Sequence, residues 1–288
     1  MEPTNKLSYV KKVIIGLVLM ASVITIWDQV QYVLGIGWAS DLESEVYADD
    51  DLYGNSYVGD GCTVAGVQFH GDLYTYYDPE LQSTDDIASS EDISYYLSLA
   101  EDTPNIEVIL LEIDSYGGTP VASQELADTL QTYVTKPVVV QIRQSGLSGA
   151  YWVASAGDYI FASALSDIGS IGVTMSYLDE SKLNEKDGYT YNQISSGKFK
   201  DSGDPQKVLT AEEKAIFQRD VDITHAAFVT AVAVNRGMDS EAVRSLADCS
   251  SMMGEMALEN GLIDEVGGYY EILDYIEGAY GVDPMVCW

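Results

Sequence analysis

Basic residues are scarce in this chain of 288 amino acids. Lysine and arginine together number 14, against 46 aspartates and glutamates, and the formal net charge at pH 7 is −32. A surface of this charge repels the phosphate backbone of nucleic acids, which excludes a DNA- or RNA-binding protein. The acidity fits either general solubility or adaptation to a salty environment, and the sequence alone does not separate these two explanations.

Histidine and cysteine are also few, and this limits the chemistry. His70 ends a predicted strand and His225 lies inside a predicted long helix; no triad motif surrounds either, so both are expected to be structural. The cysteines, Cys62, Cys249 and Cys287, fit no metal-binding spacing and no Cys–His motif, so we expect neither a metal nor another cofactor. Outside the cytosol one pair could be oxidised and leave a free thiol; otherwise they are small core residues.

The N-terminus carries the long apolar run of the chain. Residues 13–27 follow Lys11 and Lys12, and no further lysine or arginine appears before Lys136. A membrane helix needs about 20 residues, and flanking residues can extend this run to that length. Positive charge before the run predicts a cytosolic N-terminus with the rest of the chain outside. We expect a single-pass protein of the cell membrane; a cleaved signal peptide is the alternative.

The rest of the chain alternates between strand-like and helix-like segments. We predict an anchor with its cytosolic tip over residues 1–38, an acidic linker over 39–61 and a folded domain over 62–288. Apolar runs predict strands at 63–69, 108–113, 138–142 and 159–162, and helical periodicity predicts helices at 91–99, 121–133, 149–156, 211–235 and 240–247. This alternation is typical of an α/β fold with parallel strands and flanking helices.

Ser148 stands in the run SGLSGAYW directly after a predicted buried strand, and Lys198 and Lys200 lie downstream in SSGKFKD. A serine hydroxyl is a poor nucleophile until a base takes its proton. Lysine is the remaining choice here, and burial must lower the pKa of a lysine before it can act in this way. The residues themselves do not choose between the two lysines.

Glycines accompany the serine. The Gly149 N–H is placed to stabilise an oxyanion, and the pair Gly117–Gly118 ends a predicted strand, where a free N–H could supply a second donor. A tight turn is the alternative interpretation of the pair. An extended substrate would pair its backbone near Gly118. Apolar neighbours of the serine predict apolar substrate pockets: Leu147, Tyr151 and Trp152.

Six segments in this order resemble the signal peptide peptidase A family. They are DSYGG at 114–118, SGLSGAYW at 145–152, GSIGV at 169–173, SGKFKD at 196–201, FVTAVAVNRGM at 228–238 and GEMALENGLIDEVGG at 254–268. The resemblance spans about residues 63–276. It implies a Clp protease/crotonase-like fold, a membrane anchor, a catalytic domain outside the cytosol and homo-oligomeric rings that cut peptides.

The resemblance also implies roles for single residues. Ser148 corresponds to the nucleophile, Lys200 to the base, Ser170 to the serine that orients the lysine, and the Gly117 and Gly149 N–H groups to the oxyanion hole. The chain departs from the family at Tyr116, where a proline usually precedes the glycine pair.

We therefore expect a membrane-anchored serine endopeptidase with a Ser–Lys dyad that degrades cleaved signal peptides or similar apolar peptides. One alternative is a stomatin-cleaving membrane protease with the same dyad. The other is a non-catalytic crotonase-like scaffold that binds peptides. The joint presence of Ser148, Lys200 and Ser170 argues against the scaffold, because a decayed site would have lost at least one of them.

Overall fold

The computed structural model describes residues 61–77 and 87–288. The chain divides into two units, residues 1–55 and 56–288, and all described residues belong to the second. The predicted anchor and most of the acidic linker lie outside the described residues. Within the described part, no helix combines the length and apolar character that a membrane crossing requires.

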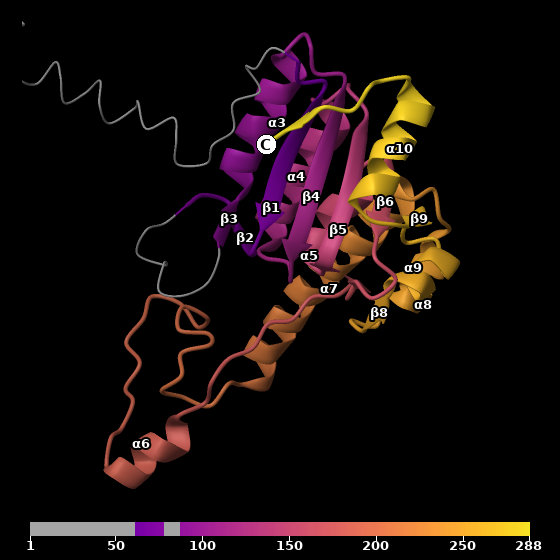
Figure 1. The fold of residues 1–288 in the computed structure, drawn as a ribbon. Coiled ribbons are helices and arrows are strands. Elements are labelled where there is room, and N and C mark those ends of the chain that lie inside the picture. The colour runs from indigo at the N-terminus through magenta and orange to yellow at the C-terminus, as the bar shows by residue number, and fades with distance from the viewer. Residues whose placement is uncertain (1–60, 78–86) are drawn as a thin grey trace, which may run out of the picture. The chain divides into compact units, whose positions relative to one another are not determined.

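A mainly parallel sheet forms the centre of the second unit (Figure 1). Its strands follow the order β10-β1-β4-β5-β6-β9: β10 (Val286–Cys287), β1 (Val64–His70), β4 (Val108–Ser115), β5 (Val138–Leu147), β6 (Tyr159–Ala162) and β9 (Glu265–Val266). Beyond this row, β7 (Asp167–Gly169) pairs with the end of β5, and β8 (Ser251–Met253) runs antiparallel to β7. Two short strands, β2 (Asp72–Tyr74) and β3 (Ile87–Ser89), form a separate parallel pair.

Helices cover both faces of this sheet (Figure 1). One face packs against α3 (Ser90–Asp102), α4 (Pro120–Thr132), α5 (Gly149–Ser155) and the end of α7 (Ala211–Asn235). The other face packs against α10 (Tyr269–Tyr280). The remaining helices are short: α6 (Ser181–Asp187), α8 (Ser240–Leu246) and α9 (Gly254–Glu259). The predicted α/β fold with parallel strands and flanking helices is confirmed.

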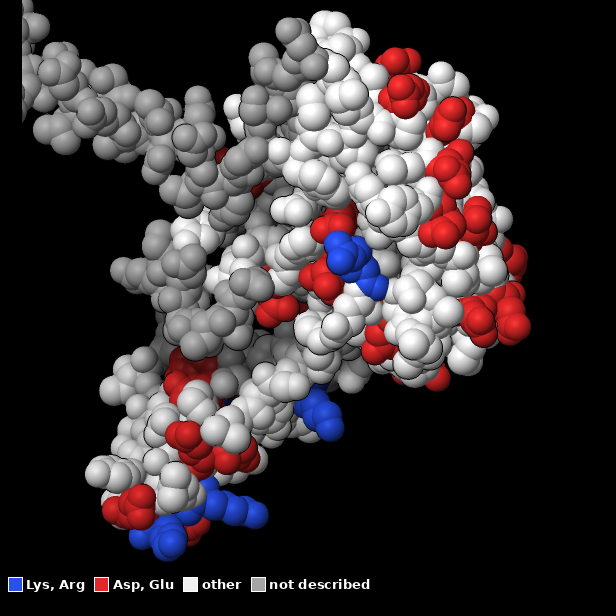
Figure 2. All heavy atoms as spheres, viewed as in Figure 1, with Lys and Arg blue, Asp and Glu red and all other residues white. Residues whose placement is uncertain are grey.

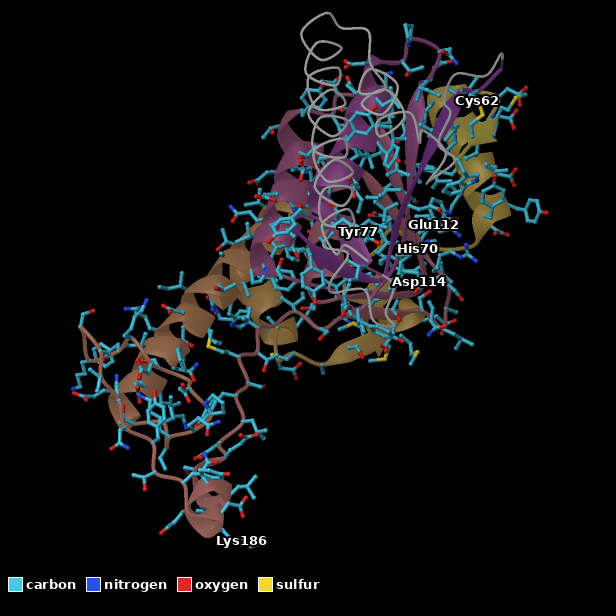
Figure 3. The ribbon with its side chains drawn as sticks, turned by 90° about the vertical axis from the view of Figure 1, so that its left-hand side faces the viewer. Cys62, His70, Tyr77, Glu112, Asp114 and Lys186 are labelled. Atoms are coloured by element: carbon cyan, nitrogen blue, oxygen red, sulfur yellow. A yellow bond between two sulfur atoms is a disulfide. The ribbon has the colours of Figure 1, made fainter. Side chains whose placement is uncertain are left out.

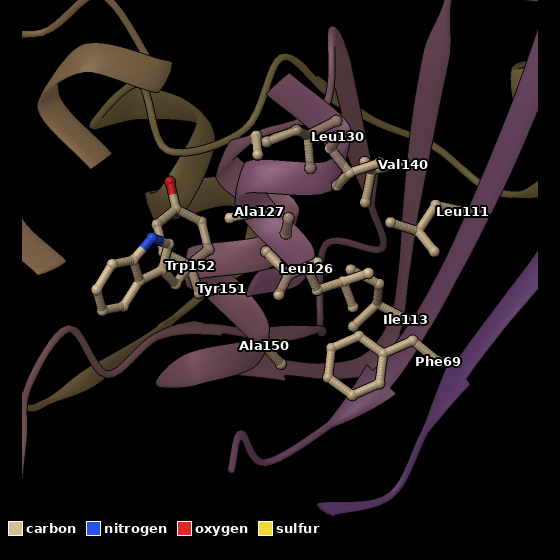
Figure 4. Packing of buried hydrophobic residues seen from close by; sticks show 14 of the residues in the cluster. Phe69, Leu111, Ile113, Leu126, Ala127, Leu130, Val140, Ala150, Tyr151 and Trp152 are labelled. Atoms are coloured by element: carbon tan, nitrogen blue, oxygen red, sulfur yellow. The ribbon is translucent and has the colours of Figure 1, made fainter. Parts of the chain in front are cut away.

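Burial on both faces explains why the central strands read as apolar runs rather than as alternating patterns. On the α4 and α5 side, Phe69 and Ile113 lie near Leu126, and Val140 lies near Leu130, in one buried cluster (Figure 4). On the α10 side, another set of buried residues packs together: Val64, Val108, Leu110, Val139, Phe161, Ile272 and Ile276. This two-sided core fixes the ends of β4 and β5, from which the candidate site is built.

Residues 174–219, which we call the arm, comprise α6, the loops around it and the start of α7. Most of its side chains are exposed, and α6 buries none. A local cluster begins α7: Thr210 caps the helix, and the carboxylate of Glu213 accepts hydrogen bonds from Thr210 N at 2.9 Å and Lys207 Nζ at 2.6 Å. The arm is therefore ordered by its own polar contacts more than by the core.

A disulfide joins Cys62, just before β1, to Cys287 in β10, across 225 positions of sequence. Cys249 is a free, exposed thiol. One oxidised pair with one free thiol is the arrangement that the sequence analysis gave for a chain outside the cytosol, in place of three reduced core cysteines.

Candidate active site

A cavity of about 350 Å³ opens where β5 passes into α5. Its lining brings together five residues that were predicted from the sequence: Gly118, Ser148, Gly149, Trp152 and Ser170. They come from three separate segments, the loop after β4, the turn after β5 with the start of α5, and the turn after β7. The carboxyl ends of neighbouring parallel strands meet at one edge of a sheet, and ligands of α/β proteins bind at this edge.

Ser148 occupies the turn between β5 and α5 in a rare backbone conformation, with φ 49° and ψ −125°. A positive φ at a residue other than glycine costs roughly 1–3 kcal/mol and persists only where the surroundings impose it. Here the Ser148 N–H donates to Gly169 O at 2.8 Å, which ties the turn to β7. Among the described residues, no base accepts the Ser148 hydroxyl proton.

Two backbone amides beside Ser148 are free of protein partners within the described residues: the N–H groups of Gly118 and Gly149. They are close neighbours, because a Cβ placed on Gly149 would lie 3.3 Å from Gly118 N. Two unpaired N–H groups next to a nucleophile are the donors that an oxyanion requires.

The prediction that Gly117 supplies one of these donors is wrong. Its N–H donates to Ser115 Oγ at 3.0 Å inside the turn. Gly117 has φ 119°, a conformation that turns its amide back toward Ser115 and leaves the next amide, that of Gly118, beside the cavity. The two amides that remain free beside Ser148 are therefore those of Gly118 and Gly149.

Both positions require glycine. A Cβ on Gly118 would lie 2.1 Å from Leu73 O, and one on Gly149 would lie 2.2 Å from Ser123 Oγ. Leu73 also brackets the turn through its backbone, since Leu73 N donates to Gly117 O and Thr119 N donates to Leu73 O, both at 2.8 Å. Strand β2 therefore holds the glycine turn against the cavity.

Ser170 lines the same cavity and also has a positive φ, 49°. Its hydroxyl donates to Cys249 O at 3.1 Å, and its N–H donates to Ser250 O at 3.0 Å. Cys249 itself lines the cavity with φ 70°. Cys249 was not predicted to be a site residue, because nothing in its local sequence marks it.

Lys200 does not line the cavity. It is exposed, in the arm loop before α7. Lys198 forms an exposed ion pair with Glu212 and lies 5.3 Å from the centre of the Phe199 ring. The structure therefore brings the predicted nucleophile, Ser170 and the glycines together, but not the predicted base.

The apolar wall of the cavity is formed by Trp152 and Phe228. Their rings stack with centroids 4.9 Å apart and an interplanar angle of 10°. Phe228 comes from α7, and Thr224, one helical turn earlier, also lines the cavity. The residue pattern at 228–238 indicates a helix that contains Phe228. It does not indicate which face of that helix lies beside Ser148.

Two predicted substrate contacts are not in this wall. Tyr151 is wholly buried, and its hydroxyl donates to Leu262 O at 2.8 Å. Burial raises the pKa of the Tyr151 phenol, so the group stays neutral. Leu147 is half-buried at the end of β5 and does not line the cavity. Tyr151 is a core residue rather than a substrate contact (Figure 4).

Titratable side chains elsewhere in the described ranges form no group of histidine, cysteine and carboxylate residues that could hold a metal ion. The cavity presents the Ser148 hydroxyl beside two backbone N–H donors.

The chain is similar in sequence to known proteins that are named as proteases. The profile of peptidase family S49 matches residues 131–283, a range that contains Ser148, Ser170 and Lys200. A protein of Methanocaldococcus jannaschii whose name designates it a protease is 36% identical over 191 residues, which are 65% of this chain and 61% of that protein. A protein of Enterococcus faecium named as a signal peptide peptidase SppA is 36% identical over 174 residues, 60% of this chain and 51% of that protein.

The chain thus spans about half to two thirds of the length of these relatives. Among solved structures, a mutant of the 1510-N membrane-bound stomatin-specific protease in complex with a substrate peptide aligns with a TM-score of 0.51 at 18% identity. The alignment covers 75% of this chain and 81% of that one. At this identity the likeness shows a shared fold.

Proposed function

The chain belongs to peptidase family S49, and from this premise we propose that it is a serine endopeptidase whose nucleophile is Ser148. The observation that carries the proposal is the placement of Ser148, in a strained turn beside two unpaired amides and an apolar wall. Ser148 Oγ attacks the scissile carbonyl, and the Gly118 and Gly149 N–H groups receive the oxyanion. One such donor typically contributes about 10²–10³ in kcat.

Lys200 is the proposed base. As a neutral amine it takes the proton of Ser148 Oγ and then delivers that proton to the leaving amine of the substrate. Ser170, which lies in the cavity with a hydroxyl bonded to a backbone oxygen, orients the amine when it arrives. Because Lys200 lies on the exposed arm, the reaction requires an arm to bring this lysine to a Ser148, either in the same chain or in another copy.

The proposed substrates are extended apolar peptides such as cleaved signal peptides. The stacked Trp152 and Phe228 rings offer an apolar pocket, and an extended backbone can pair beside Gly118. The E. faecium relative named as a signal peptide peptidase supports this choice.

We further propose that the catalytic domain lies outside the cytosol, anchored to the cell membrane through residues 13–27, and that copies assemble into a ring. The Cys62–Cys287 disulfide supports an oxidising location, since such bonds persist outside the cytosol. A ring with its sites facing inward would admit extended peptides and exclude folded proteins.

The test combines labelling with cleavage. A serine-reactive phosphonate probe should label the wild-type chain and not Ser148→Ala, and mass spectrometry should show a signal peptide cut while a folded protein stays intact. Mixing Ser148→Ala chains with Lys200→Ala chains then locates the base: restored activity means that Lys200 acts across copies, and no restoration means that it acts within one chain. Equal labelling of Ser148→Ala would contradict the proposed nucleophile.

A further inference from the structure

A second cavity, of about 520 Å³, lies on the face of the sheet that α10 partly covers. Gln68, Glu112 and Gln141 line it side by side, in register on β1, β4 and β5. Arg143, Tyr269 and Trp288 complete its lining. It shares no lining residue with the cavity of Ser148, and its volume lies within the range of about 300–1,000 Å³ that small-molecule sites occupy.

This face of the sheet changes character along its strands. Near their starts, Leu110 and Val139 are buried against α10. Two residues further along each strand stand Glu112 and Gln141, which are also buried, with 5% and 6% of their surface exposed. The polar part lies toward the carboxyl ends of the parallel strands, where ligands of α/β proteins bind. In the view of Figure 2, basic and acidic side chains meet on the sheet, and Figure 3 shows His70 beside Glu112.

Each oxygen of the Glu112 carboxylate has a partner within the protein. Its Oε1 lies 3.0 Å from His70 Nε2, and its Oε2 accepts from Arg143 Nη1 at 2.6 Å. Burial raises the pKa of Glu112, but the bonds from His70 and Arg143 outweigh it, so the pKa is lowered and the group stays charged. Glu112 supplies the side-chain carboxylate of this lining, and both of its oxygens already have partners in the protein.

Arg143, by contrast, has N–H donors that Glu112 does not use. Its side chain is 53% exposed, and a guanidinium carries five N–H donors, of which Nη1 serves Glu112. Planar guanidinium groups bind carboxylates through paired hydrogen bonds. The cavity therefore offers an anion, and a carboxylate in particular, a place at Arg143.

Gln141 carries the second observation. Its Oε1 is buried and has no hydrogen-bond partner among the described residues. A buried acceptor without a partner destabilises a fold. An apolar residue at position 141, such as the valine found at position 139 on the same face of β5, would avoid this cost. The amide is explained if a ligand donates an N–H to it.

We propose that this cavity binds the carboxyl end of a short peptide. The terminal carboxylate lies on Arg143, the last peptide N–H donates to Gln141 Oε1, and the last side chain packs against Trp288. The Trp288 ring already lies flat over the sheet at Gly66, where a Cβ would come 2.3 Å from it, and so forms an apolar floor. This binding site is independent of the proposed peptidase activity.

Isothermal titration of the full chain with glycyl-phenylalanine and glycyl-leucine tests the proposal. We expect saturable binding of at least one of them, and about tenfold weaker binding of the same dipeptide with its carboxylate converted to an amide, because charge-assisted hydrogen bonds are roughly twice as strong as neutral ones. Equal affinity for acid and amide, or no saturable heat from either dipeptide up to about 10 mM, overturns the proposal.

Substitution locates the binding. Gln141→Leu removes an amide that has no partner in the protein, so its Tm should equal or exceed the wild-type value while dipeptide affinity falls about tenfold. Gln144→Leu is the matched control, on the same strand but exposed and outside the lining, and should bind as the wild type does. Unchanged affinity in Gln141→Leu places the dipeptide elsewhere and refutes the site.

Discussion

The two halves of α7 have different surroundings. The second half is part of the core, where Phe228, Val229 and Val232 are buried and Phe228 walls the cavity of Ser148. The first half belongs to the arm and buries Glu213, which is held by polar contacts. The proposed nucleophile therefore sits on a frame fixed by packing, and the proposed base on a segment fixed by local hydrogen bonds. The proposed chemistry would depend on two regions that the fold stabilises in different ways.

The largest expected effect tests whether Ser148 on the core and Lys200 on the arm act as one catalytic unit. Ser148→Ala and Lys200→Ala should each lower kcat by about 10⁴-fold or more, because nucleophile and base act together. Lys198→Ala, the matched control two positions away in an exposed ion pair, should keep most activity. Steady-state kinetics on an apolar peptide measures this, and an inactive Lys198→Ala with an active Lys200→Ala would reverse the assignment of the base.

The next effect concerns Ser170, the residue that we propose orients the lysine amine. Ser170→Ala should lower kcat by roughly tenfold to a hundredfold, less than the 10²–10⁴ that a general base contributes, since it removes a group that orients the amine. A lysine acts as a base only when neutral, so wild-type activity should rise with pH. A pH–rate profile that is flat from about pH 5 to about pH 10 argues against any lysine base.

A smaller effect is expected in the second half of α7, which is part of the core. Phe228→Leu should reduce kcat/KM for apolar peptides about tenfold, because small losses of apolar pocket contact cost roughly 1–3 kcal/mol. Val234→Ala, on the same helix but 72% exposed, should leave kcat/KM unchanged. If the two variants behave alike, the stacked wall does not contact substrate.

The smallest effect is expected on the arm side. The hydrogen bond from Lys207, together with those from Thr210, lowers the pKa of Glu213 to about 2. Glu213→Gln should speed amide hydrogen exchange in the first turns of α7 and leave the core unchanged. A carboxylate with a lowered pKa stabilises the fold at pH values above the usual pKa of glutamate, and this contribution is lost as the pH falls toward 2. The difference in exchange rate between the wild type and Glu213→Gln should therefore shrink as the pH falls.

Glu212→Gln provides the control for that measurement. Its carboxylate forms an exposed ion pair with Lys198, and such pairs contribute little. Faster exchange in Glu212→Gln than in Glu213→Gln would show that the buried cluster does not hold the arm.

Much of the site could be predicted from the sequence because its residues follow strand ends. Ser148 follows the strand predicted at 138–142, and Ser170 was selected through the family resemblance. Both stand directly after strands in the structure, and parallel strands bring such ends together. Positions one residue apart could not be resolved. Which amide of Gly117–Gly118 faces the cavity depends on the turn, and whether Tyr151 or Trp152 faces it depends on the rotation of α5. The sequence also did not show that Lys200 lies exposed and outside the cavity, because local sequence does not give the position of a loop relative to the sheet.

The Cys62–Cys287 bond has a practical consequence for an enzyme with an exposed arm. It closes nearly the whole described chain into a covalent ring, with the arm inside the loop. A single cut in the arm, by another protease or by a second copy, opens the backbone but leaves both pieces attached. Such a nicked chain migrates as two fragments only after reduction.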